Sequence, residues 1–173
     1  MGKIIKDKKI YDIWHNMIYR CGNPKYPTYM DCSVCAEWLE YKNFKTWYLK
    51  NYYSIENEKM CVDKDILYKG NKVYSALTCC IIPERINMLL TSRQLHRGKL
   101  PIGVYFHNNK YEAKCKIDGK DKYLGSYDNA ISAFKAYKKE KENAIKQVAN
   151  QYKNRIPKHI YHALMNYSID YND

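Results

Sequence analysis

Hydrophobic residues recur at helical spacing in the first part of the chain. One stripe predicts a helix over residues 7–20 that ends near Gly22. Its members are Ile10, Ile13, Trp14, Met17 and Ile18. A second amphipathic helix should begin where Asn43 caps it and carry Phe44, Trp47, Tyr48 and Tyr52.

The pattern changes to a period of two in residues 103–127. Asn108-Asn109 and Asp118-Gly119 separate alternating runs, and these residue types tolerate the positive φ of tight hairpin turns. In the middle run, Tyr111, Ala113, Cys115 and Ile117 share one face, while Glu112, Lys114 and Lys116 share the other. We therefore expect three antiparallel strands with one packed and one solvated face.

A helix should follow these strands and cover their packed face. Asp128 is the expected N-cap, and the helical stripe begins with Ala130, Ala133, Phe134, Tyr137 and Lys141. The stripe continues to Tyr152, and Pro157 starts another helix that carries Ile160 and Leu164. The whole pattern predicts an α+β protein.

Charge is distributed unevenly along the 173 residues, which carry a formal net charge of +12. Residues 97–155 hold 14 basic and 6 acidic residues, so the excess coincides with the predicted sheet and its helix. Such an excess favours nucleic acid as partner, although a solvated lysine-rich surface would give the same composition. We divide the chain into modules at 1–95 and 99–150 and a helical tail at 151–173, with a basic connector over residues 88–101.

Nothing in the sequence indicates a membrane protein. Lysines interrupt the first apolar residues, and no apolar run approaches the roughly 18 residues of a membrane span. We expect a cytoplasmic protein with no membrane partner, whose seven cysteines are reduced.

The sheet region resembles the Apetala-two (ethylene-response-factor) DNA-binding domain. The matching runs are G-V-Y at 103–105, K-Y-E-A-K at 110–114, Y-L-G-S-Y-D at 123–128 and A-x-x-A-Y at 133–137. The resemblance implies a three-stranded sheet that enters the major groove of double-stranded DNA. By position it assigns contacts to Tyr105, His107, Lys114, Lys116, Asp121, Tyr123 and Ser126, and we add Lys122. Arginine, the side chain that grips guanine bidentately, is absent from these positions, which weakens the case for base specificity.

The preceding region resembles the HNH homing endonucleases of phages, several of which carry an Apetala-two module. The runs that match are R-C-x-N-P at 20–24, V-C-x-E-W at 34–38, V-D-K-D at 62–65 and G-N-K-V-Y-S at 70–75. The resemblance implies two hairpin strands and a helix, an HNH-like ββα module, with Asp63 and Asn87 binding one Mg²⁺ or Mn²⁺.

The same resemblance shows a degenerate active site. Lys64 stands where the family has the histidine that activates water, and Thr78 replaces the central asparagine. A protonated lysine can hold a phosphate but is a poor base. The catalytic candidates are thus Asp63, Lys64 and Asn87. Either Asp65, His15 or His96 supplies the missing base, or the fold has kept DNA binding and lost cleavage.

The cysteines raise the alternative of structural zinc. Cys32 and Cys35 have zinc-knuckle spacing, and Cys21 and Cys79 would complete four ligands. A second paired motif is missing, so burial as small apolar side chains is the favoured role.

These observations predict a DNA-binding protein of phage or mobile-element origin that either nicks DNA or only binds it. The alternative is a phage-encoded anti-defence inhibitor that blocks a host nucleic-acid enzyme by binding the enzyme or its DNA.

Overall fold

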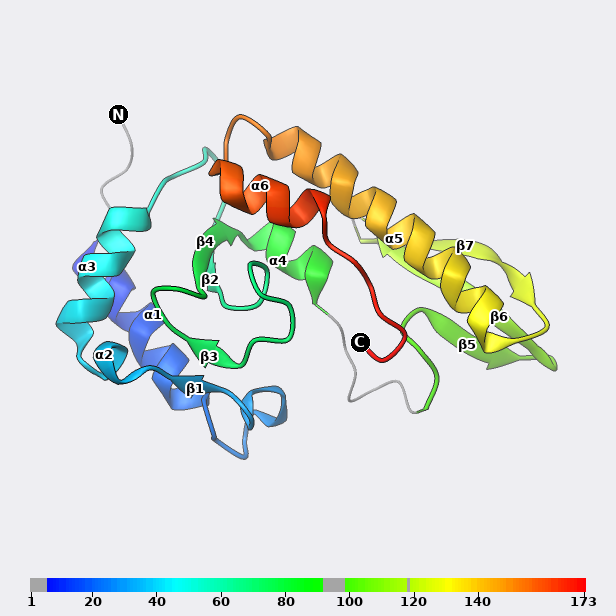
Figure 1. Cartoon of the computed structure of the whole chain (residues 1–173), viewed down its shortest axis with the longest axis horizontal. Coiled ribbons are helices and arrows are strands. Elements are labelled where there is room, and N and C mark those ends of the chain that lie inside the picture. The colour runs from blue at the N-terminus through cyan, green and yellow to red at the C-terminus, as the bar shows by residue number, and fades with distance from the viewer. Residues whose placement is uncertain (1–5, 92–98, 118) are drawn as a thin grey trace. The chain divides into compact units, whose positions relative to one another are not determined.

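The computed structural model describes residues 6–91, 99–117 and 119–173, and the chain forms two compact units, residues 1–87 and 88–173. Each unit combines helices with small sheets, so the α+β prediction is confirmed (Figure 1). The unit boundary falls within helix α4 (Glu84–Leu90), ahead of the predicted boundary at residue 95. Half of the predicted basic connector, residues 92–98 including His96, lies outside the described residues. In the described part of the chain, no helix is long and apolar enough to cross a membrane.

Helix α1 (Asp7–Arg20) confirms the first predicted stripe. Ile10 and Met17 are buried, and the rest of the stripe packs against the same core. The indole of Trp14 donates a hydrogen bond to the carbonyl of Trp38 at 2.7 Å, which ties α1 to the short helix α2 (Ala36–Leu39). The chain leaves α1 through Gly22, whose φ of +66° suits glycine.

Helix α3 (Tyr41–Asn51) begins earlier than the sequence predicted. Glu40 is its N-cap, and Asn43 lies inside the first turn, where its side chain donates to the carbonyl of Glu37. The prediction that Asn43 caps this helix is therefore wrong, because a contact with the preceding helix uses its amide. Phe44 and Tyr48 are fully buried and join Trp38 in the core of unit 1.

Two small sheets complete unit 1. Strand β1 (Ser33–Val34) pairs in parallel with β3 (Val73–Tyr74), and β2 (Met60–Asp63) pairs antiparallel with β4 (Cys80–Pro83). Every residue of β4 is buried, and α4 follows it directly. Asp63 is the last residue of β2, and the partner strand β4 leads into α4.

Unit 2 contains the predicted three-stranded sheet. Strands β5 (Val104–His107), β6 (Lys110–Ile117) and β7 (Lys120–Tyr127) pair antiparallel in the order β5-β6-β7. Asn108 and Asn109 have φ of +48° and +57°, as the first predicted hairpin turn requires. Asp118 of the second turn lies outside the described residues.

Helix α5 (Ala130–Tyr152) packs on one face of this sheet. Ala113 and Cys115 are buried on that face, which confirms the predicted sorting of β6 by parity. At Gly103, φ is +76°, and a Cβ would lie 2.0 Å from Cδ2 of Tyr137. Only glycine fits there, since the helix ring lies directly against the backbone.

The N-cap of α5 is Asn129, whose side chain accepts a hydrogen bond from the backbone N–H of Ser132 at 2.9 Å. The prediction that Asp128 is the cap is wrong, because the Asp128 carboxylate pairs instead with Lys110 of β6. The predicted tail is part of unit 2, where α6 (Lys158–Met165) packs against α5 through buried residues that include Ile160 and Leu164.

Candidate nucleic-acid interface and metal-ligand loop

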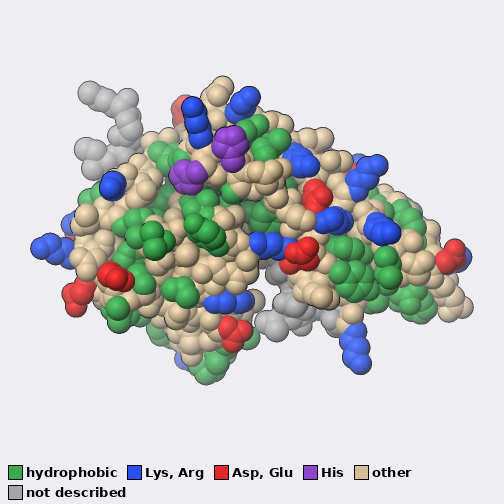
Figure 2. All heavy atoms as spheres, in the orientation of Figure 1, with side chains coloured by type: hydrophobic (Ala, Val, Ile, Leu, Met, Phe, Trp, Pro, Cys, Tyr) green, Lys and Arg blue, Asp and Glu red, His purple; other side chains and the backbone are tan. Residues whose placement is uncertain are grey.

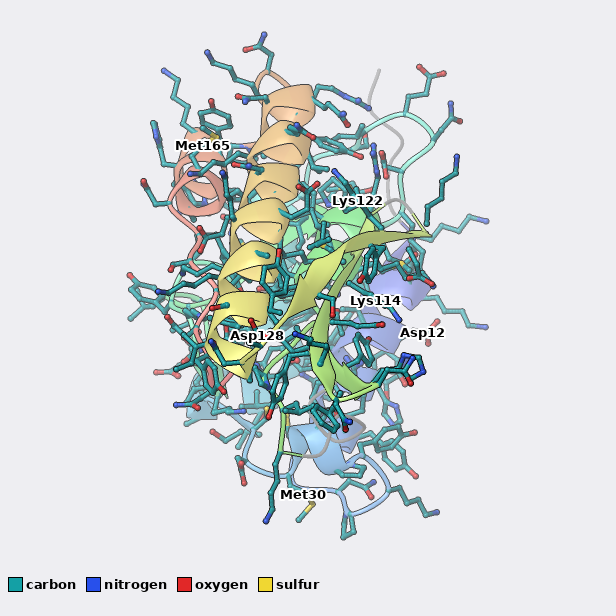
Figure 3. All side chains as sticks on the ribbon, turned by 90° about the vertical axis from the view of Figure 1, so that its right-hand side faces the viewer. Asp12, Met30, Lys114, Lys122, Asp128 and Met165 are labelled. Atoms are coloured by element: carbon teal, nitrogen blue, oxygen red, sulfur yellow. The ribbon has the colours of Figure 1, made fainter. Side chains whose placement is uncertain are left out.

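The face of the sheet that α5 does not cover gathers side chains from all three strands. Tyr105 of β5 lies opposite Glu112 of β6, and Glu112 lies opposite Ser126 of β7. Farther along β6, Lys114 lies opposite Tyr123, and the next outward position is Lys116. We call this surface the outer sheet face; Figure 3 shows Lys114 on the side of the sheet away from α5.

A β-bulge makes this gathering possible. Ala113 pairs with Gly125, but the next residue of β6, Lys114, pairs with Tyr123, so Leu124 is an extra residue in β7. In a regular strand, residues 123 and 126 would point to opposite faces. The extra residue brings Tyr123 and Ser126 to the same face.

The outer sheet face holds seven of the eight predicted DNA contacts. The seven are Tyr105, His107, Lys114, Lys116, Asp121, Tyr123 and Ser126. Lys122 is the exception. It pairs with the inward residue Cys115, and its ammonium lies 2.8 Å from the carboxylate of Glu140 on α5. Alternation thus places Lys122 on the helix side of the sheet, apart from the other predicted contacts, and its contact with DNA stays a prediction.

Glu112 is the polar centre of the outer sheet face. Its carboxylate accepts from Lys114 at 2.7 Å and lies 3.3 Å from Nδ1 of His107. The hydrogen bond from Lys114 holds the pKa of Glu112 below its usual range, and the same bond raises the pKa of Lys114. Sequence reasoning placed Glu112 on this face without giving it a role, although its position beside Lys114 signals an ion pair.

The outer sheet face is only mildly basic. Its three lysines, at positions 110, 114 and 116, oppose the two carboxylates of Glu112 and Asp121. Residues 88–173 hold 16 basic and 8 acidic residues, and Figure 2 shows several of the basic ones along α5. Tyr105 and Tyr123 are 54% and 56% exposed, so this face combines two accessible rings with a few lysines.

In unit 1, Asp63 ends strand β2 and organises the loop that follows. Its Oδ1 accepts hydrogen bonds from the backbone N–H groups of Asp65 at 3.0 Å and Ile66 at 2.8 Å. Burial raises the pKa of Asp63 to about 6, and the nearby carboxylate of Asp65 adds to the rise. Asp63 therefore stabilises its own turn.

Lys64 is folded into the same loop. Its ammonium donates to Oδ2 of Asp65 and to the backbone carbonyl of Asn71, each at 3.0 Å, and its side chain is 11% exposed. Burial works to lower the pKa of Lys64, but Asp65 outweighs it and the pKa ends above its ordinary value. Lys64 is thus a protonated, internally bonded ammonium.

Asn71 is a residue whose importance the sequence reasoning missed. Its side-chain amide donates to the carbonyls of Lys64 and Val73, each at 2.7 Å, and so closes the loop from the other side. Thr78 supports the same turn by donating to the carbonyl of Val73. The position of Asn71 within the motif G-N-K-V-Y-S was the available signal.

The remaining catalytic candidates come from other elements. Asn87 is half-buried in α4, and His15 lies on the exposed side of α1 between Tyr11 and Tyr19. Among the alternative bases in the described ranges, the structure brings Asp65 alone beside Asp63, and Asp65 is bonded to Lys64.

In this arrangement Asp63 and Asp65 accept hydrogen bonds from donors of their own loop, and binding of Mg²⁺ or Mn²⁺ by Asp63 and Asn87 stays a prediction. Oδ1 of Asp63 is used by two backbone donors, and the Lys64 ammonium occupies the vicinity of the two carboxylates. Within the described ranges, no three His, Cys, Asp or Glu side chains are grouped so that they could hold a metal. We derive no catalytic step through Mg²⁺ or Mn²⁺ at this loop.

The cysteines proposed for zinc lie in or against the hydrophobic core of unit 1. Cys32 and Cys79 are buried, Cys21 and Cys35 are half-buried, and all four are free thiols. Burial raises the pKa of Cys79 to about 12 and also raises the pKa of Cys21 and Cys35. Zinc stays a prediction, while these positions suit small apolar packing.

Comparison with known protein families, with curated proteins and with solved structures finds no match to this chain. Function is therefore inferred from the sequence motifs and from the geometry of the outer sheet face and the Asp63 loop.

Proposed function

We propose that this chain is a DNA-binding protein, related to the HNH homing endonucleases, that contacts double-stranded DNA through the outer sheet face. The observation that carries the proposal is the gathering of seven candidate contacts on one exposed surface, which depends on the bulge at Leu124. None of these side chains is needed for the core that the sheet forms with α5.

The chemistry of the outer sheet face suits a DNA backbone better than a base sequence. Lys114 and Lys116 are exposed ammonium groups that can contact phosphates, and Tyr105 and Tyr123 offer hydroxyls and rings to sugars and bases. Arginine is absent from this face, and its bidentate contact to guanine is the commonest specific contact in the major groove. We expect affinity with modest sequence preference.

Unit 1 supports relationship to the nucleases without supporting cleavage. The paired strands β2 and β4, with β3 between them in the chain, and the helix α4 that follows β4 match the strand, strand and helix that the HNH resemblance implies, with Asp63 on β2 and Asn87 on α4. The side chains of Asp63 and Lys64 are nevertheless bonded within their own loop. We infer that the protein binds DNA and does not cut it.

Binding is tested by fluorescence anisotropy with a labelled duplex over a series of salt concentrations. The double variant Lys114→Ala with Lys116→Ala should bind about tenfold more weakly near 0.1 M salt, with a salt slope reduced by about 2. Lys122→Ala is the matched control, because it removes a lysine of the same sheet from the opposite face. Equal losses in the control and the double variant would move the interface away from the outer sheet face.

Cleavage is tested separately with supercoiled plasmid in Mg²⁺ or Mn²⁺, beside EDTA and an Asp63→Ala variant. We expect plasmid that is retarded at low salt but intact. A metal-dependent nicked product that disappears in Asp63→Ala would establish a nuclease and overturn the inference of binding alone.

A further inference from the structure

Four exposed rings line one side of α1 and the loop that follows it. Tyr11, His15 and Tyr19 are four residues apart, so each lies about one helical turn from the next. The ring centroids are 6.0 Å apart for Tyr11 and His15 and 6.2 Å for His15 and Tyr19, with planes within 22° and 8° of parallel. Tyr26 packs its edge on Tyr19 at 5.8 Å. We call Tyr11, His15, Tyr19 and Tyr26 the aromatic ladder.

The aromatic ladder lies outside the packing of the core. The buried residues of α1 are Ile10 and Met17, whereas Tyr11 and Tyr19 are each 45% exposed and Tyr26 is 36% exposed. Adjacent large rings on a soluble surface commonly mark a binding site. Because the rings hold one another in place, little conformational freedom would be lost when a ligand stacks on them.

Basic residues flank the aromatic ladder in the sequence. Residues 6–26 contain five basic residues against the two carboxylates of Asp7 and Asp12. Asp7 is paired with Lys45 at 2.9 Å, which leaves Asp12 as the exposed acid nearest the rings in sequence. Lys8 lies one turn before Tyr11, and Lys25 precedes Tyr26. A polyanion would meet a net positive surface here.

We propose that the aromatic ladder binds the unpaired bases of a single-stranded nucleic acid. Successive bases stack on exposed aromatic side chains in sequence-tolerant single-strand binding, while nearby lysines contact the backbone. A duplex hides its base faces within the stack, so the ladder suits unpaired bases. This surface belongs to unit 1 and adds a second ligand class to the duplex binding proposed for unit 2.

The proposal is tested by anisotropy with labelled oligonucleotides of about 12 nucleotides, a length within the range that one small binding fold covers. A dT oligonucleotide and an rU oligonucleotide separate DNA from RNA as the source of unpaired bases. The double variant His15→Ala with Tyr19→Leu should lose about tenfold or more in affinity for the preferred strand. Tyr19→Phe keeps the ring and should retain most of the affinity.

Two controls separate this surface from the outer sheet face. Tyr68→Leu removes a tyrosine of unit 1 that is 60% exposed but outside the ladder, and it should bind single strands like the wild type. Lys114→Ala with Lys116→Ala should weaken duplex binding and leave single-strand binding unchanged. Unchanged single-strand affinity in the ladder variant, with its helix content intact by circular dichroism, would overturn the proposal whatever the duplex result.

Discussion

The two candidate sites use their charged groups in opposite ways. In unit 1, Asp63 and Lys64 are each 9% exposed and are bonded to the backbone of their own loop. In unit 2, Lys114 and Lys116 stand on an uncovered face, and Glu112 is the carboxylate that holds Lys114. The loop that resembles a catalytic motif is thus the one whose side chains form hydrogen bonds that stabilise the fold.

Under the proposed function, this difference gives Asp63 and Lys64 a structural role that does not depend on cleavage. Oδ1 of Asp63 accepts two backbone hydrogen bonds and Lys64 bonds to the carbonyl of Asn71, so loss of either set of hydrogen bonds would lower stability whether or not DNA is cut. The lysines of the outer sheet face make no comparable contribution to the fold, because surface ion pairs contribute little. Substitutions should therefore affect stability in unit 1 and affinity in unit 2.

The largest expected effect is at Lys64. Lys64→Met removes the donor to the carbonyl of Asn71 and the partner of Asp65, so unit 1 should lose about 3 kcal/mol of unfolding free energy. Urea unfolding followed by tryptophan fluorescence measures this, since all three tryptophans lie within residues 1–87. Lys72→Met, an exposed lysine of the same loop, is the control and should change stability little. Equal unfolding free energies for the two variants would contradict the view that the charged groups of this loop stabilise unit 1.

Asp63→Asn tests how the buried carboxylate changes the free energy of unfolding with pH. The pKa of Asp63 is about 6 in the folded chain and 3.8 ordinarily. Between these two pH values, the folded state keeps a proton that the unfolded state has released. Stability should therefore fall as pH rises from about 4 to 6, by up to about 3 kcal/mol, and then level off. Asn keeps an acceptor for the two N–H groups and cannot ionise, so the variant should lack this fall.

The measurement is urea unfolding of both proteins at several pH values between 4 and 7. The variant should be the more stable protein at pH 7 and similar to the wild type near pH 4. If the unfolding free energies of the two proteins change with pH in parallel, the folded chain stabilises ionised Asp63 as well as the unfolded chain does.

Local pattern predicted the elements of the fold well. The stripe of α1, the three strands of unit 2 and the outward position of Lys114 depend on periods of 3.6 and 2, which the sequence displays directly. Helix caps were less predictable. Asp128 and Asn129 are adjacent and both suit an N-cap, and the ion pair between Asp128 and Lys110 decides between them.

The candidate sites depended more on contacts between distant residues. The bulge at Leu124 is a property of the register between β6 and β7, which a single strand does not display. The engagement of Lys64 by Asn71 joins residues seven apart in an irregular loop, where no period predicts neighbours. Residue type and family position identified Asp63 and Lys64, but burial and hydrogen bonding indicate what they do.

A buried lysine in unit 2 sharpens the comparison with Lys64. Lys141 is 9% exposed on the buried side of α5, and burial lowers its pKa. Within the described residues, no ion pair is found for Lys141, and removing a buried charge of this kind stabilises a fold. Lys141→Met should therefore raise the unfolding free energy of unit 2 by about 1 kcal/mol. Thermal unfolding followed by circular dichroism checks this, with Lys139→Met on the exposed side of α5 as the control. A destabilised Lys141→Met protein would mean that both buried lysines support the fold.

The smallest expected effect is at Glu112 and concerns affinity. Glu112→Gln keeps the shape of the side chain but removes the negative charge that holds Lys114 and faces His107. Lys114 would then be free to contact phosphate, and duplex DNA should bind about threefold more tightly at low salt. Anisotropy with the same labelled duplex measures the change, and the gain should shrink as salt rises.

Glu140→Gln, which removes a carboxylate from the helix side of the sheet, should leave affinity unchanged, because Glu140 pairs with Lys122 on the opposite face. Tighter binding in both variants would indicate a general effect of net charge, and only a gain confined to Glu112→Gln would place the duplex on the outer sheet face.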